Sequence, residues 1–189
     1  MAAKVLTYHK INPAEFREQA GYLKSHGDVL ITFDDGLINF PHEIVREFNL
    51  PVTLFINPGL LGEGDRMSAS EVIKLSELGV TIANHGWSHR PFANLSESEI
   101  KSEYERARDW ISENIKVNAA PEILALPRGS ESPHTRAQLG TLGIKLIYGA
   151  ERVDVYPGRS LNYFKLSLNP IFQWLRRKKS RVIKLFSYD

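Results

Sequence analysis

Short runs of apolar, β-branched residues alternate along the chain with longer segments in which apolar residues recur every three or four positions. The short runs predict strands and the longer segments predict helices. The strands are expected at residues 4–8, 28–33, 52–56, 80–83, 121–126, 144–148 and 161–168, and the helices at 13–25, 37–49, 68–78, 96–115 and 132–142. Strands that alternate with helices are typical of a parallel α/β sheet or barrel.

The helix at 96–115 has the clearest start signal. Ser96 is a suitable N-cap, and Glu99 follows three residues later, which is the spacing of a capping box. Ile100, Tyr104 and Ala107 then fall on one face of the helix.

Composition indicates one ordinary globular unit. The chain has 189 residues, of which 42% are hydrophobic and 24% are charged, and we expect a single catalytic domain over residues 1–189. Cysteine is absent from the sequence, so disulfides and thiolate metal sites are excluded, and a metal ion would need His, Asp or Glu ligands. The sequence contains neither a membrane-length apolar run nor a secretory leader pattern, which predicts a cytoplasmic protein.

The net charge of +2 is unevenly distributed. Residues 170–189 carry six basic side chains against one aspartate, whereas residues 1–169 carry 18 basic and 21 acidic side chains. The basic segment either closes the domain while its charges stay solvated, which we favour, or makes a weak contact with an anionic membrane surface. No nucleic-acid recognition motif accompanies it, so nucleic-acid binding is not expected.

The first chemical motif is the run Thr32-Phe33-Asp34-Asp35-Gly36. Neighbouring side chains of a strand point to opposite faces, so the two aspartates converge only if the strand ends there, and Gly36 permits such a turn. Carboxylates at the carboxyl end of a parallel strand occupy the usual catalytic rim of α/β folds. The alternative is an ordinary solvated turn.

The second motif is Asn84-His85-Gly86-Trp87-Ser88-His89, directly after a predicted strand. Two imidazoles at this spacing can bind one metal ion, and a carboxylate would complete a His₂Asp site. Alternatively, both histidines are surface residues, or one is a hydrogen-bonded core residue. Together the two motifs describe a hydrolase, because one aspartate can complete the metal site while the other acts as a base toward water.

These residues resemble a known family. The strings TFDDG at 32–36, N-H-x₃-H at 84–89 and LPVTLFI at 50–56 are similar to those of the polysaccharide deacetylases, carbohydrate esterase family 4 with its NodB-homology domain. The resemblance covers residues 4–168 and implies an irregular (β/α)₇ barrel with the site at the carboxyl ends of its strands. It also implies that Asp34 is the general base and that Asp35, His85 and His89 bind one divalent ion, zinc or else nickel or cobalt.

The third family motif is altered in this sequence. Leu124-Ala125-Leu126-Pro127-Arg128-Gly129 keeps the proline and glycine, so the backbone N–H of Arg128 is expected to help hold an oxyanion. The family's arginine is replaced by Ala125, and Arg128 stands where an aromatic groove wall is usual. We therefore expect a compensating basic residue or an altered substrate pocket. Lys165, on the predicted strand at 161–168, is a weaker candidate for that role.

The family's leaving-group acid is a histidine near the carboxyl terminus, and no histidine follows His134 here. The opening Val5-Leu6-Thr7-Tyr8-His9 instead resembles the circularly permuted subgroup, in which that histidine lies on the first strand. We therefore assign the acid to His9, whose alternative is an inconsequential strand-end histidine. Trp87 is expected to shape the floor of the site.

The sequence thus predicts metal-dependent hydrolysis of an N-acetyl or N-formyl amide on a carbohydrate or a nucleotide- or lipid-linked sugar precursor. One alternative is a catalytically degenerate homologue that binds carbohydrate or a partner protein. Another is a deacylase of a non-sugar amide.

Overall fold

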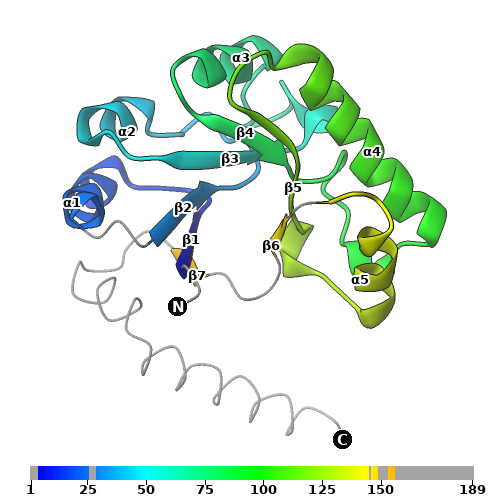
Figure 1. Cartoon of the computed structure of the whole chain (residues 1–189). Coiled ribbons are helices and arrows are strands. Elements are labelled where there is room, and N and C mark those ends of the chain that lie inside the picture. The colour runs from blue at the N-terminus through cyan, green and yellow to red at the C-terminus, as the bar shows by residue number, and fades with distance from the viewer. Residues whose placement is uncertain (1–3, 26–28, 145, 149–152, 156–189) are drawn as a thin grey trace, which may run out of the picture.

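The computed structural model describes residues 4–25, 29–144, 146–148 and 153–155 (Figure 1). Helices and strands alternate along this part of the chain. In order, the elements are β1 (Lys4–Tyr8), α1 (Pro13–Lys24), β2 (Val29–Phe33), α2 (His42–Phe48), β3 (Val52–Ile56), η1 (Pro58–Leu60), α3 (Ala69–Glu77), β4 (Thr81–Asn84), η2 (Phe92–Asn94), α4 (Glu97–Asn114), β5 (Ala119–Ala125), η3 (Pro127–Gly129), α5 (Pro133–Gly140), β6 (Leu146–Tyr148) and β7 (Val153–Val155).

All pairings between these strands are parallel, and the sheet order is β6-β5-β4-β3-β2-β1-β7. The sheet curves, and the helices lie around its outer side (Figure 1). The predicted α/β class and irregular barrel of parallel strands are therefore confirmed. None of the described helices is long and apolar enough to cross a membrane.

Two segments differ from the sequence prediction. Residues 37–41 are not helical, because Leu37 forms an antiparallel bridge with Arg66 and the helix starts only after Pro41. The short strand β7 pairs with β1 and was not expected. The predicted strand at 161–168, with Lys165, and the basic segment at 170–189 lie outside the described residues.

The capping box predicted for the helix after residue 96 is confirmed in α4. The Ser96 side chain accepts a hydrogen bond from the Glu99 backbone N–H, and the Glu99 carboxylate accepts one from the Ser96 N–H. The buried face of α4 consists of Ile100, Glu103, Tyr104, Ala107 and Ile111.

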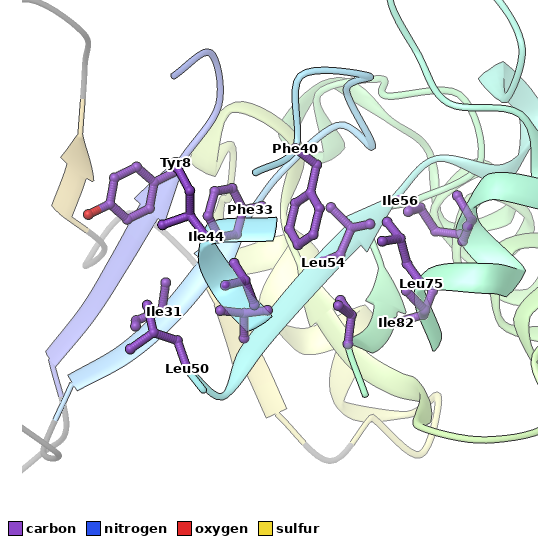
Figure 2. Packing of buried hydrophobic residues seen from close by; sticks show 14 of the residues in the cluster. Tyr8, Ile31, Phe33, Phe40, Ile44, Leu50, Leu54, Ile56, Leu75 and Ile82 are labelled. Atoms are coloured by element: carbon purple, nitrogen blue, oxygen red, sulfur yellow. The ribbon is translucent and has the colours of Figure 1, made fainter. Parts of the chain in front are cut away.

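The two faces of the sheet have different side chains, and this difference positions the site. The outward-facing residues of β1–β4, among them Leu6, Phe33 and Leu54, join α1–α3 in one apolar cluster (Figure 2). The inner face instead carries the buried threonines Thr7 and Thr32, whose hydroxyls are hydrogen-bonded at 3.0 Å, together with small or aromatic residues of β3–β5. Side chains alternate along a strand, so a residue two positions beyond each of these faces the same interior.

Candidate active site

Four adjacent strands end with a polar residue that continues the inner face. His9 follows Thr7 by two positions, Asp34 follows Thr32, Asn57 follows Phe55, and His85 follows Ala83. The strands pair in parallel in the order β4-β3-β2-β1, so their carboxyl ends lie along one edge. Strand alternation and strand pairing together bring these four side chains to one place.

A left-handed turn after β2 brings the second aspartate to the same place. The backbone N–H of Asp34 donates to the Tyr8 carbonyl at 2.9 Å and thereby continues the pairing of β1 and β2 by one residue. Asp35 and Gly36 then adopt φ values of 72° and 64°. Two successive residues in this region reverse the chain, which explains how neighbouring carboxylates converge. The sequence predicted a turn at Gly36 but not the positive φ of Asp35.

Asp35, His85 and His89 offer one ligand atom each, and these atoms all lie within 4.8 Å of one another. The Asp35 Oδ1 atom lies 3.0 Å from His89 Nε2 and 3.5 Å from His85 Nε2. Burial acts to raise the pKa of the Asp35 carboxyl, but the adjacent imidazoles of His85 and His89 outweigh burial and hold that pKa well below its usual range. Asp35 is therefore a carboxylate at neutral pH.

The tautomer of His85 is fixed by a backbone group. His85 is buried, and its Nδ1 lies 2.8 Å from the carbonyl oxygen of Ala125, which can only accept a hydrogen bond. Nδ1 therefore donates to this carbonyl, and Nε2 is the ring nitrogen that faces Asp35 and Asp34. Carbonyl-bound imidazoles of this kind are typical of metal-ligating histidines.

Asp35, His85 and His89 are suited to bind a metal ion. His85 Nε2 is buried and has no hydrogen-bond partner among the described residues. A buried polar atom without a partner costs about 1–3 kcal/mol, and a ligand removes that cost. Two imidazoles and one carboxylate are also a common donor set for catalytic divalent ions, which leaves further positions for water and substrate.

The loop that carries both histidines is held by two buried polar side chains. The Asn57 amide donates to the carbonyls of His85 at 2.5 Å and Gly86 at 3.2 Å. From α4, the Glu103 carboxylate accepts hydrogen bonds from Ser88 N at 2.8 Å and Ser88 Oγ at 2.6 Å. Ser88 immediately precedes His89, which has a left-handed φ of 60°, so Glu103 braces the chain where its conformation is least favourable.

Trp87 lies within the same loop, half-buried. Its carbonyl accepts a hydrogen bond from Gly59 N at 3.0 Å, and a Cβ atom added to Gly59 would lie 2.4 Å from the indole nitrogen. On the indole ring, the guanidinium of Arg106 lies 4.2 Å from the ring centroid. Trp87 thus packs against the backbone after β3 and supports the histidine loop.

Asp34 lies between two histidines. Its Oδ2 atom is 3.8 Å from His9 Nε2 and 3.7 Å from His85 Nε2, and its side chain is fully buried. His9 is one-third exposed. Asp34 therefore lies inside the protein, whereas His9 is accessible to a substrate.

The sequence-predicted residues within the described ranges fall into two groups. His9, Asp34, Asp35, His85 and His89 are brought together, with Trp87 in the same loop. Pro127 and Arg128 lie in η3, after the strand whose Ala125 carbonyl contacts His85. Sequence reasoning missed Asn57, Glu103 and the Ala125 carbonyl. A signal existed for Glu103, because it is a charged residue on the apolar face of α4.

A family model described as polysaccharide deacetylase matches residues 23–147, which is more than half of the chain. The chain belongs to the polysaccharide deacetylase family. The resemblance seen in the two motifs is thereby confirmed, and with it membership of a family named for carbohydrate deacetylation.

Solved structures of deacetylases share the fold. Streptococcus pyogenes deacetylase PplD, solved in complex with acetate, superimposes with a TM-score of 0.79 at 17% identity, covering 90% of this chain and 99% of that chain. A family 4 carbohydrate esterase from Bacillus anthracis gives 0.52 at 16% identity, with 94% and 77% covered. The chitin deacetylase of Colletotrichum lindemuthianum gives 0.50 at 18% identity, with 78% and 55% covered.

Proposed function

We propose that this protein is a metal-dependent deacylase that removes an N-acetyl or N-formyl group from a carbohydrate or a sugar-linked precursor. The observation that carries the proposal is the convergence of Asp35, His85 and His89 beside a buried Asp34. Family membership supports the substrate class. Zinc is the ion we favour, with nickel or cobalt as alternatives.

In this proposal Asp35, His85 and His89 hold the ion, which supplies Lewis acidity toward the amide carbonyl and a nearby water molecule. Asp34 Oδ2 takes the proton from the attacking water. His9 then gives a proton to the departing amine. The Asp34 carboxylate lies 3.8 Å from His9 Nε2 and orients the imidazole. The backbone N–H of Arg128 stabilises the oxyanion, and Pro127 and Trp87 shape the walls of the site.

The deciding experiment separates metal binding from turnover. Asp34→Asn should reduce acetate release from an acetylated chitooligosaccharide by at least about a thousandfold, since it removes the base and leaves the ligands intact. Elemental analysis should find the same metal content in this variant as in the wild type. Asp109→Asn, on the exposed side of α4, is the matched control. Near-normal activity of Asp34→Asn would refute the base assignment.

A second candidate function follows from Ala125. The family's arginine is missing at this position, and in this alternative its absence prevents turnover, so that the protein binds acetylated sugar without hydrolysing it. A metal-loaded wild type that binds chitooligosaccharide in calorimetry but releases no acetate would establish this alternative. Membrane contact through residues 170–189 stays a prediction, tested by co-sedimentation with anionic liposomes.

A further inference from the structure

Unfavourable backbone conformations in this protein concentrate at the candidate site. Among the described residues other than glycine, five have a positive φ, namely Asp35, Asn49, His89, Asn118 and Arg128. Asparagine and aspartate visit this conformation more readily than other residues, because their short side chains bond locally, and histidine is also enriched there. Asp35 and His89 are candidate metal ligands, and Arg128, whose φ and ψ are 58° and 17°, is the one of the five that is of none of these three types. Strain of this kind persists where function requires it, and Arg128 is the member of the group with no role for its side chain so far.

The turn around Arg128 is firmly held. Gly129 N donates to the Leu126 carbonyl at 2.9 Å, and Ser130 N donates to the Pro127 carbonyl at 3.1 Å. The Ser130 hydroxyl also accepts a hydrogen bond from Ala93 N at 3.3 Å, which ties the turn to η2. Arg128 itself is exposed, whereas Pro127 is buried. The fold therefore presents this side chain on a rigid support.

Arg128 follows by three residues Ala125, which contacts a candidate metal ligand. That ligand is His85, which Ala125 contacts through the 2.8 Å hydrogen bond. Three residues span at most about 11 Å, so the Cα of Arg128 lies within that distance of Ala125. An arginine side chain is long enough to contact a substrate bound between Arg128 and the candidate metal ligand His85.

The charge of Arg128 is available to a ligand. Five of the eight arginines in the described ranges pair with a carboxylate, and these are Arg17, Arg46, Arg90, Arg108 and Arg136. Within the same ranges, no carboxylate lies within 4 Å of Arg128. Arg106, which stacks on Trp87, adds a second positive charge beside the histidine loop. An exposed guanidinium on a rigid turn is suited to bidentate binding of a phosphate or carboxylate.

We propose that the Arg128 side chain is a specificity determinant that binds an anionic group, a phosphate or a carboxylate, on the sugar whose amide is hydrolysed. The inference rests on the proposed deacylase function and narrows its substrate class from carbohydrates in general to anionic sugars. In this proposal the Arg128 side chain binds the anionic group of the substrate, whereas the backbone N–H of the same residue stabilises the oxyanion.

The test compares three substrates that share one acetamido group. These are N-acetylglucosamine 1-phosphate, N-acetylmuramic acid and the neutral methyl N-acetylglucosaminide, which together separate a phosphate from a carboxylate. We expect wild-type kcat/KM to favour at least one anionic substrate over the neutral one by about tenfold or more, with the ratio falling as salt is added. Arg128→Gln should bring that ratio to within about twofold of unity, and Arg128→Lys should give an intermediate ratio.

Arg90→Gln is the matched control, because Arg90 is an exposed arginine already paired with Glu99 at 2.8 Å. It should keep the wild-type ratio. A wild type that hydrolyses the neutral sugar as efficiently as both anionic ones would overturn the proposal, as would an unchanged ratio in an Arg128→Gln protein that folds normally by circular dichroism.

A protein without deacylase activity would be recognised because none of the three substrates would be hydrolysed. If no substrate is hydrolysed, calorimetric binding of N-acetylglucosamine 1-phosphate and the methyl glycoside still decides the question. Tighter binding of the phosphate that Arg128→Gln abolishes supports recognition by Arg128 in a protein without turnover. Equal binding of the two sugars, or a preference that Arg128→Gln leaves intact, refutes it.

Discussion

Glu103 offers the sharpest test of how the fold holds the histidine loop. Its buried carboxylate accepts two hydrogen bonds from Ser88, the residue before His89. Replacing Glu103 with alanine removes both acceptors and leaves a gap beside Gly86, whose added Cβ would lie 3.4 Å from the Glu103 carboxylate. The perturbation therefore acts on the loop without touching a candidate ligand.

The magnitude follows from the two contacts. A hydrogen bond to a charged group contributes about 1.5–3 kcal/mol, and Ser88 is half-buried, so we expect the free energy of unfolding to fall by about 2–4 kcal/mol in Glu103→Ala. Glu103→Gln keeps the shape and one acceptor, and it should lose about 1–2 kcal/mol. Loss of a group that orients a ligand weakens metal binding by about 10- to 100-fold, and Glu103→Ala should fall in that range.

Two measurements separate these effects. Urea denaturation in excess chelator gives the stability of the metal-free protein, and titration with Co²⁺, followed by visible absorbance, gives the metal affinity. Glu113→Ala is the control, since Glu113 is an exposed glutamate on the same helix. A folded Glu103→Ala protein with wild-type Co²⁺ affinity would show that the Ser88 contacts do not set the position of His89.

Three further outcomes are expected. Gly59→Ala should destabilise the protein by about 1–3 kcal/mol in urea, because the new Cβ overlaps Trp87, whereas Gly140→Ala, in open space at the end of α5, should be neutral or stabilising. Saturating Zn²⁺ at about 100 times Kd should add about 2.7 kcal/mol of stability, seen as a higher Tm in the wild type but not in His85→Ala. Hydrogen bonds from the Ser96 backbone and the Arg90 side chain lower the pKa of Glu99 to about 2. Its stabilisation is therefore full above the unfolded pKa near 4.5 and disappears as pH falls toward 2, so urea midpoints of the wild type and Glu99→Gln should differ at pH 7 and converge at low pH.

The positions of the strands and the residues of the site were predictable to the extent that each depends on local sequence pattern. Apolar runs identified the strands β1–β5, because the residues at the carboxyl end of each of these strands are buried. The motif residues were identified because each follows such a run directly. The strand β7 escaped prediction because three residues carry too little pattern, and its pairing with β1 is a long-range contact.

The supporting groups could not be predicted in the same way. Glu103 is far from His89 in sequence, and only the packing of α4 against the loop brings its carboxylate to Ser88. The Ala125 carbonyl is a backbone group, so no residue type marks it. Asn57 follows β3 as Asp34 follows β2, and the alternation rule would have placed it at the site if amides had been searched as well as charged groups.

Adjacency in the sheet explains why a histidine at the start of the chain can reach Asp34. β1 and β2 are neighbours in parallel register, with Tyr8 opposite Phe33, so the next residue of each strand, His9 and Asp34, also meet. The interior beneath them is closed by Phe55, Ala83 and Ala125, which form one packed cluster. An arginine in place of Ala125 would have to displace that cluster, because its side chain is much larger than a methyl group. Ala125 and His9 are therefore compatible features of one barrel interior, in which strand pairing rather than chain order determines which residues meet.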